Sequence, residues 1–289
     1  MPQGMVSANG IRFAYLEEGP PDGPLALCLH GFPDTAHTWR FLLPALAEAG
    51  FRAVAPWTRG YAPTEVPADG RYQTGALATD ANALHEALGG DDRAVLVGHD
   101  WGAMTSYAAA AHQPGRWRRG VTMGVPPFGA VAAGFLTYAQ LKRSFYIFVF
   151  QTPFAEPAVA ADDLAFVERL WEDWSPGFDG THDLAHVKES LRDPASLSAA
   201  IAYYRAMFDP STHDPEYAEA QAAASAVPPQ PFLYLHGKND GALGIETVTD
   251  PLAFLSPGSR YLEIEDAGHF LHLEQPKVVG DLVLEFLTA

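Results

Sequence analysis

Short apolar runs alternate with helical patterns along the first half of the chain. The run over 11–19 alternates apolar and polar residues, which predicts a half-buried antiparallel strand. Further strands are predicted over 24–31, 51–56, 93–98 and 119–125, and helices over 38–50, 74–90 and 102–114. Strands that alternate with helices indicate an α/β fold, in which helices cover both faces of a mostly parallel sheet.

The pattern changes after residue 126. From 127 to 227 the chain is helical and rich in aromatic residues, and it contains no convincing strand. Strand-like runs return over 231–240 and 259–270, and a last helix is predicted over 276–287. We therefore expect a discontinuous core domain, 1–126 with 228–289, and a helical cap (lid) domain over 127–227.

Composition excludes several classes of protein. The chain has 289 residues, of which 48% are hydrophobic, and 18 lysines and arginines stand against 35 aspartates and glutamates. A net charge of −17 argues against nucleic acid or an anionic membrane as partner. Without a signal-peptide or membrane-spanning pattern, the expected location is cytoplasmic. The single cysteine, Cys28, excludes an intrachain disulfide, and the histidine spacing predicts no metal.

An aspartate interrupts the apolar run "AVLVGHDWGAM" where a predicted strand meets a predicted helix. Asp100 has Gly98 and Gly102 two residues away on either side. A strand that turns sharply into a helix crowds the backbone, and small residues at these two positions relieve the crowding. This pattern is typical of a nucleophile elbow, which lifts one side chain into a cleft. The alternative is an aspartate that caps the helix, but the paired glycines favour a nucleophile.

A nucleophile of this kind needs a base and a residue that orients the base. In elbow folds these follow along the chain in the order nucleophile, acid, histidine. Asp240 in "HGKNDG" and His269 in "EDAGHF" come in this order, each after a predicted strand. Asp240 alone would also suit a turn, and His269 alone would suit a structural loop. Asp266 is a weaker candidate for the acid because it lies too close in sequence to His269.

Attack also requires donors for the negative charge that develops on oxygen. The segment "HGFPD" follows the second predicted strand, so the backbone amides of Phe32 and Trp101 are expected to form an oxyanion hole. Pro33 would fix this turn, and the peptide bond before it is a candidate for the cis form. His30 and His99 are interpreted as structural residues.

The segments "HGFP", "GHDWG", "HGKND" and "GHF" resemble, in this order, the α/β-hydrolase fold over nearly the whole chain. The aspartate at the elbow narrows the resemblance to epoxide hydrolases and to haloalkane and haloacetate dehalogenases. In these families a carboxylate attacks carbon and forms an alkyl–enzyme ester. The resemblance implies that Asp100 is the nucleophile, and it excludes a serine esterase.

The cap segments distinguish the two branches. "SFYIFVFQTPFAE" and "LSAAIAYYRAMF" resemble cap segments of epoxide hydrolases that each carry a ring-opening tyrosine, here Tyr146 and Tyr204. The alternative is that both are core aromatics of the cap. Trp101 could supply one halide donor, but "HGFP" lacks an asparagine for the second. Haloacetate dehalogenases place arginine where this chain has Trp101, so Arg59 is interpreted as structural.

The sequence thus predicts an epoxide hydrolase that opens an apolar epoxide with water to a vicinal diol and needs no cofactor. The expected substrate pocket is lined by Trp101, Phe150, Phe154, Trp171 and Trp174. The alternatives are a dehalogenase with the same three residues, or a ligand-binding protein without catalysis. The oligomeric state is left open, with a homodimer as the candidate.

Overall fold

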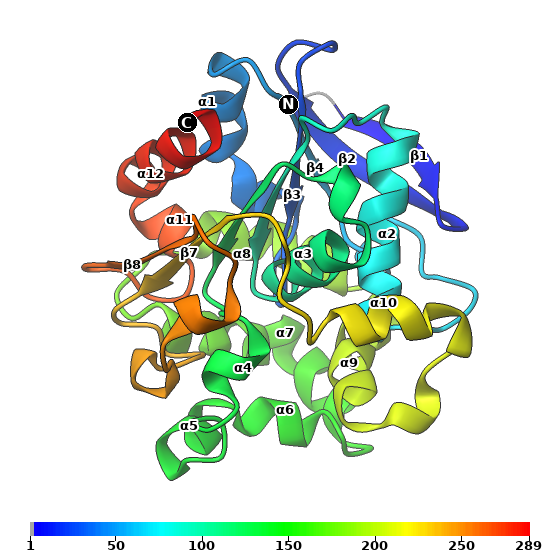
Figure 1. Ribbon diagram of the computed structural model, residues 1–289. Helices are drawn as coiled ribbons and strands as arrows, with labels where there is room; N and C mark the ends of the chain where they lie inside the picture. The colour runs from blue at the N-terminus through cyan, green and yellow to red at the C-terminus, as the bar shows by residue number, and fades with distance from the viewer. Residues whose placement is uncertain (1–2) are drawn as a thin grey trace.

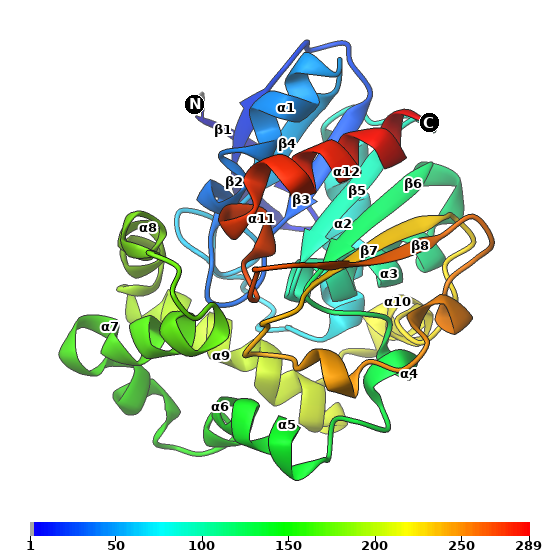
Figure 2. The same cartoon turned by 90° about the vertical axis from the view of Figure 1, so that its left-hand side faces the viewer.

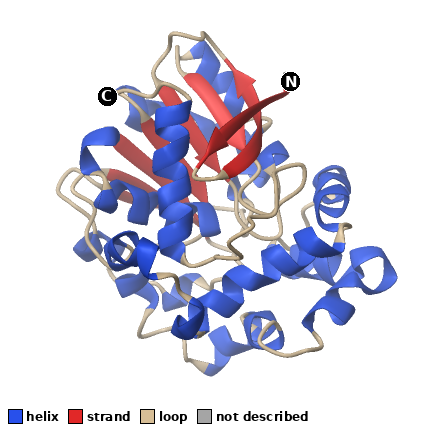
Figure 3. Ribbon diagram, turned by 90° about the vertical axis from the view of Figure 1, so that its right-hand side faces the viewer, coloured by secondary structure: helices blue, strands red, loops and turns tan. Residues whose placement is uncertain are grey.

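A single mixed sheet of eight strands forms the centre of the computed structural model, which describes residues 3–289 (Figures 1 and 3). The strand order is β1-β2-β4-β3-β5-β6-β7-β8. The strands are β1 (Gln3–Ala8), β2 (Ile11–Glu18), β3 (Leu25–Leu29), β4 (Arg52–Pro56), β5 (Val95–His99), β6 (Arg119–Met123), β7 (Phe232–Gly237) and β8 (Arg260–Ile264). β2 runs antiparallel to β1 and β4, and all other pairs are parallel. The predicted α/β-hydrolase fold is confirmed.

Helices cover both faces of the sheet (Figure 2). On one face α1 (Leu42–Glu48) packs against α12 (Pro276–Thr288), which follows the short α11 (Leu271–Glu274). On the other face α2 (Thr74–Ala87) packs against α3 (Trp101–His112). Two apolar clusters result, one on each face, because the parallel strands bury side chains on both sides.

The chain between β6 and β7 is helical and contains no strand. Its helices are α4 (Phe128–Val131), α5 (Tyr138–Arg143), α6 (Phe145–Val149), α7 (Ala155–Trp174), α8 (Thr181–Leu191), α9 (Pro194–Phe208) and α10 (Ala218–Ala223). Helices α4 to α7 and α9 lie below the sheet in Figure 1, α8 packs against α7 and α9, and α10 packs against α2 and α3. Within α7 the backbone leaves helical angles at 161–164. No helix of the described chain is long and apolar enough to cross a membrane.

The structure differs from the predicted elements in three places. β1 was not predicted, and it forms an edge strand that pairs with β2 along six residues. The expected helix over 38–50 is divided into a 3-10 turn, Ala36–Trp39, and α1, with Pro44 in the first turn of α1, where proline is tolerated. The strand expected over 259–270 ends at Ile264, so the rest of that segment is a loop.

Candidate active site

Asp100 lies at the junction of β5 and α3 with strained backbone angles, φ 53° and ψ −118°. A side chain at Gly98 would collide with the backbone of Gly102, and one at Gly102 would collide with the backbone of Leu29. The Asp100 carboxylate makes no hydrogen bond that caps α3, so the alternative interpretation as a capping residue is wrong. The sharp turn instead directs the carboxylate into a cavity.

One oxygen of this carboxylate is held by a backbone amide. The Phe32 amide donates a 2.8 Å hydrogen bond to Asp100 Oδ1. Trp101 is the first residue of α3, so its amide has no acceptor within the helix and is available to an anion. A side chain at Gly31 would collide with both the Asp100 side chain and the Trp101 amide, so this close approach requires glycine. The peptide bond between Phe32 and Pro33 is cis.

The structure brings together the three residues of the predicted triad. His269 Nδ1 lies 2.9 Å from Asp240 Oδ2, and His269 Nε2 lies 3.6 Å from Asp100 Oδ2. All three residues are buried. Asp240 Oδ1 accepts hydrogen bonds from the amides of Ala242 and Leu243 at 2.8 and 2.9 Å. These amides fix the Asp240 carboxylate with its second oxygen toward His269.

The two carboxylates control the charge of the imidazole. Burial alone would lower the pKa of His269, but Asp240 and Asp100 outweigh it and raise this pKa to about 10. Burial likewise acts to raise the pKa of Asp240, yet His269 holds it below its ordinary value. The resting site is therefore a buried imidazolium between two carboxylates.

Two cap tyrosines face each other beside this group. The rings of Tyr146 on α6 and Tyr204 on α9 are edge to face, with centroids 5.5 Å apart. Burial raises the pKa of both phenols, so both keep their protons. The Tyr204 hydroxyl is buried and has no hydrogen-bond partner among residues 3–289. The neighbouring Tyr203 points elsewhere, and its hydroxyl donates to the carbonyl of Arg59 at 2.8 Å.

A cavity of about 440 Å³ joins these groups. Asp100, His269, Tyr146 and Tyr204 all line it. The other lining residues come from the core and from the cap, and none of them is charged: Thr74, Trp101, Met104, Tyr107, Val125, Pro126, Phe128, Val131, Ala132, Phe135, Leu136, Gln140, Ser144, Ile147, Phe148, Met207, Phe208, Ala224, Ala242 and Leu243. The cavity therefore suits an apolar ligand that reacts with the carboxylate.

Of the five side chains predicted to line the substrate pocket, only Trp101 lines this cavity. Phe150 is fully buried behind the two tyrosines, and Trp174 packs its ring against His269 at 5.1 Å. The Trp171 indole donates a hydrogen bond to the carbonyl of Pro33. Phe154 is 72% exposed on the surface. The sequence pattern distinguished apolar from polar positions, but it did not show which aromatic side chains of the predicted cap face the cavity.

The residues interpreted as structural have structural partners. Arg59 is fully buried and forms an ion pair with Asp80. The ring of His30 accepts a hydrogen bond from the Thr58 amide at 3.0 Å. His99 Nε2 lies 3.0 Å from the carbonyl oxygen of His269, so it donates to the loop that carries this histidine.

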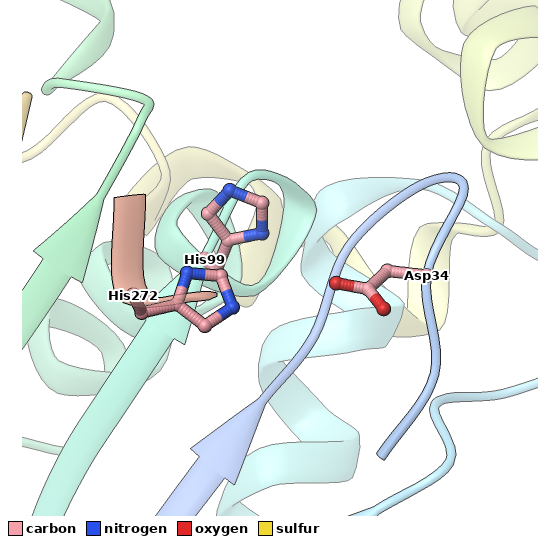
Figure 4. A group of neighbouring side chains, drawn as sticks. All are labelled: Asp34, His99 and His272. Carbon is pink, nitrogen blue, oxygen red and sulfur yellow. The ribbon is translucent and has the colours of Figure 1, made fainter. Parts of the chain in front are cut away.

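Asp34, His99 and His272 form a second buried polar group (Figure 4). One potential ligand atom from each lies within 4.8 Å of the others, so among the described residues this set could hold a metal ion. Asp34 Oδ2 and the Nδ1 atoms of both histidines have no hydrogen-bond partner. Burial favours the neutral form of each residue, because it raises the pKa of Asp34 and lowers the pKa of both histidines. A bound water molecule could supply the missing hydrogen bonds equally well. None of the three lines the cavity.

Known proteins share both the fold and the sequence pattern of this chain. The model of the alpha/beta hydrolase fold family matches residues 24–276. Epoxide hydrolase 1 of Caenorhabditis elegans is 30% identical over 292 residues, which cover 98% of this chain and 69% of the relative. An epoxide hydrolase of Caballeronia sordidicola is 30% identical over 318 residues, with 98% and 92% covered. The chain belongs to the epoxide hydrolase family of α/β hydrolases.

A solved structure agrees with this membership. Epoxide hydrolase A from Mycobacterium thermoresistibile superposes with a TM-score of 0.82 at 25% sequence identity, covering 100% of this chain and 98% of that one. For an epoxide hydrolase, a site must supply a nucleophile, a proton donor for the ring oxygen and a base for water. One carboxylate, two phenols and one imidazole of this chain line a single cavity.

Proposed function

We propose that the protein hydrolyses an uncharged apolar epoxide to a vicinal diol through an ester on Asp100. One observation carries the proposal: the Asp100 carboxylate, the His269 imidazole and both cap phenols line the same cavity. The sequence resemblance and the family relatives support the same reaction.

In the first step the two oxygens of Asp100 have different roles. Oδ1 is held by the Phe32 amide, so Oδ2 is the oxygen that attacks an epoxide carbon and forms the ester bond. The carbon–oxygen bond of the ring breaks, and its oxygen takes a proton from Tyr146 or Tyr204. Two donors that keep their protons in an apolar cavity suit this task because they act only when charge develops on the oxygen.

In the second step His269 becomes the base. Ester formation removes the negative charge of Asp100, so Asp240 alone remains beside the imidazole, and the pKa of His269 falls from about 10. The imidazolium gives its proton to the tyrosinate left by ring opening, and the neutral ring then takes a proton from a water molecule, which attacks the ester carbonyl. Negative charge develops on Oδ1, where the amides of Phe32 and Trp101 stabilise it. The ester bond then breaks, and the diol oxygen leaves with the proton of the new carboxyl group, which restores the Asp100 carboxylate and leaves His269 charged.

A dehalogenase would need donors for a free halide beside the nucleophile. Trp101 lines the cavity and could supply one such donor, but among the described residues no arginine or asparagine lines it to supply a second. A ligand-binding protein without catalysis would not need the strained elbow of Asp100. Neither alternative requires two buried phenols near one carboxylate.

The experiment that tests the proposal is a panel of epoxides and haloalkanes, assayed separately for diol and for halide. We expect diol from apolar epoxides, no halide release, and no turnover by the Asp100→Asn variant. Halide release without diol would support the dehalogenase, whereas binding without either product would support the ligand-binding protein.

The proposal extends to the wider organisation of the molecule. We propose that residues 127–227 act as a cap domain on a core of 1–126 and 228–289, with small-molecule epoxide and water as the reactants. A cytoplasmic location and a homodimer remain predictions.

A further inference from the structure

Five large apolar side chains that line the cavity are also exposed to solvent. The exposed fractions are 65% for Phe128, 72% for Leu136, 42% for Phe148, 38% for Met207 and 45% for Phe208. Asp100, His269, Tyr146 and Tyr204, by contrast, are buried. The cavity therefore runs from buried reactive groups to an apolar opening, which we call the mouth and define by these five residues.

The mouth is built from separate parts of the cap. Phe128 begins α4 and Leu136 precedes α5, Phe148 lies on α6, and the other two residues end α9. The rings of Phe148 and Phe208 stack with centroids 5.8 Å apart, so α6 and α9 meet there through aromatic contact. Exposed apolar side chains gathered at one opening point to a ligand or partner that covers them.

The walls between the reactive groups and the mouth offer little to a polar substrate. The lining includes the side-chain amide of Gln140, which is already bonded to Ser144, to the carbonyl of Ala242 and to the amide of Gly244. A volume of about 440 Å³ holds roughly 15 non-hydrogen atoms at the density of liquid water. A short epoxide would therefore leave much of this apolar space unfilled.

We infer that the preferred substrate carries its epoxide on an uncharged apolar chain long enough to reach from Asp100 to the mouth. This inference rests on the proposed function and adds the length and polarity of the substrate. The apolar chain fills the cavity, and its far end covers the exposed side chains of the mouth. Each methylene added to the chain is then transferred from water into the cavity, until the chain is long enough to pass the mouth.

The test is a series of terminal alkyl epoxides, from 1,2-epoxybutane to 1,2-epoxydodecane, each used below its solubility limit. We expect kcat/KM to rise by up to about fourfold per methylene and then to level off as the chain passes the mouth. A matched pair, 5,6-epoxyhexanoate and its methyl ester, tests charge. The epoxide of 5,6-epoxyhexanoate should be hydrolysed at least tenfold more slowly than that of the methyl ester, because the charged carboxylate would lie in the apolar cavity.

Variants locate the effect. The double variant Phe148→Ser with Phe208→Ser should lower the ratio of kcat/KM for 1,2-epoxydecane over 1,2-epoxybutane by about tenfold. Phe154→Ser removes an exposed cap phenylalanine that does not line the cavity, and it should leave the ratio unchanged.

The outcomes distinguish a failure of this inference from a failure of the proposed epoxide hydrolysis on which it rests. Hydrolysis of short and long epoxides at equal rates, or an unchanged ratio in the double variant, would overturn the inference and leave the function intact. If no epoxide of the series yields a diol, both are wrong.

Discussion

At the scale of single residues, the site depends on the charge of His269. This imidazole has a carboxylate on each ring nitrogen, Asp240 on Nδ1 and Asp100 on Nε2. The same pair of contacts that raises its pKa to about 10 would block it as a base in the resting enzyme. In the proposed mechanism, esterification of Asp100 would remove one of these contacts, so the first step would prepare the base for the second.

The raised pKa has a consequence for stability. Because the folded-state pKa of His269 exceeds the ordinary value of 6.5, its contribution to stability is fully present below pH 6.5 and is lost as pH rises through about 10. We expect the Tm of the wild-type protein to fall more steeply between pH 8 and 10.5 than that of His269→Gln. Equal slopes by thermal scanning would show that the imidazole is not charged in the resting fold.

The two phenols should share the activation of the ring oxygen. Tyr146→Phe and Tyr204→Phe should each lower kcat/KM roughly 30- to 150-fold, because each removes a charge-assisted hydrogen bond of about 2–3 kcal/mol. The double variant should fold, since both rings are kept, and should lose ring opening almost completely. Tyr203→Phe, whose hydroxyl donates to the carbonyl of Arg59, is the matched control and should lose much less. Normal turnover of epoxides by the double variant would show that the two tyrosines only contribute to packing.

At the scale of elements, the parallel strands and the helices between them follow from the apolar patterns. The elbow at Asp100 and the positions of Asp240 and His269 could also be predicted from the sequence. All three residues follow predicted strands, and the end of a strand determines where the next residue lies. The edge strand β1 was missed because its pattern is weak and its place depends on pairing with β2. The aromatic residues that line the cavity could not be predicted, because aromatic residues that face inward and those that face outward lie in similar sequence patterns. The helix faces that they occupy are decided by tertiary packing.

One cap helix also reaches the loop that carries the acid. Gln140 on α5 is fully buried, donates to the carbonyl of Ala242 at 2.9 Å and accepts from the amide of Gly244 at 3.0 Å. The amides of Ala242 and Leu243 in turn orient Asp240. We interpret Gln140 as a positioning residue that acts on His269 through this loop.

Gln140→Leu should therefore slow ester hydrolysis more than ester formation. We expect a loss on the order of tenfold in the second step, below the full value of general-base catalysis, with ester accumulating in rapid-quench experiments. It should also lower the free energy of unfolding by about 1–3 kcal/mol, because buried polar groups lose their partners. Gln151→Leu, which removes hydrogen bonds made only to cap carbonyls, is the control for stability. Equal slowing of both steps would contradict the positioning role.

At the scale of the whole molecule, the proposed division gives Asp100, Asp240 and His269 to the core and the two tyrosines to the cap. The carbonyl of Trp174, at the end of α7, accepts hydrogen bonds from the amides of Gly241 and His269 at 3.1 and 2.9 Å. One carbonyl of the segment 127–227 thus contacts both the loop that carries Asp240 and the loop that carries His269. Under the proposed function, this segment therefore supports the triad as well as supplying the two phenols.

The central claim is that the epoxide becomes esterified to Asp100 before water attacks. The most direct measurement is intact-protein and peptide mass spectrometry of His269→Gln after incubation with 1,2-epoxydecane. We predict an added mass of one substrate molecule, located on Asp100 and absent from the Asp100→Asn, His269→Gln double variant. Diol formation by His269→Gln at the wild-type rate with no adduct, or an adduct on another residue, would contradict the account.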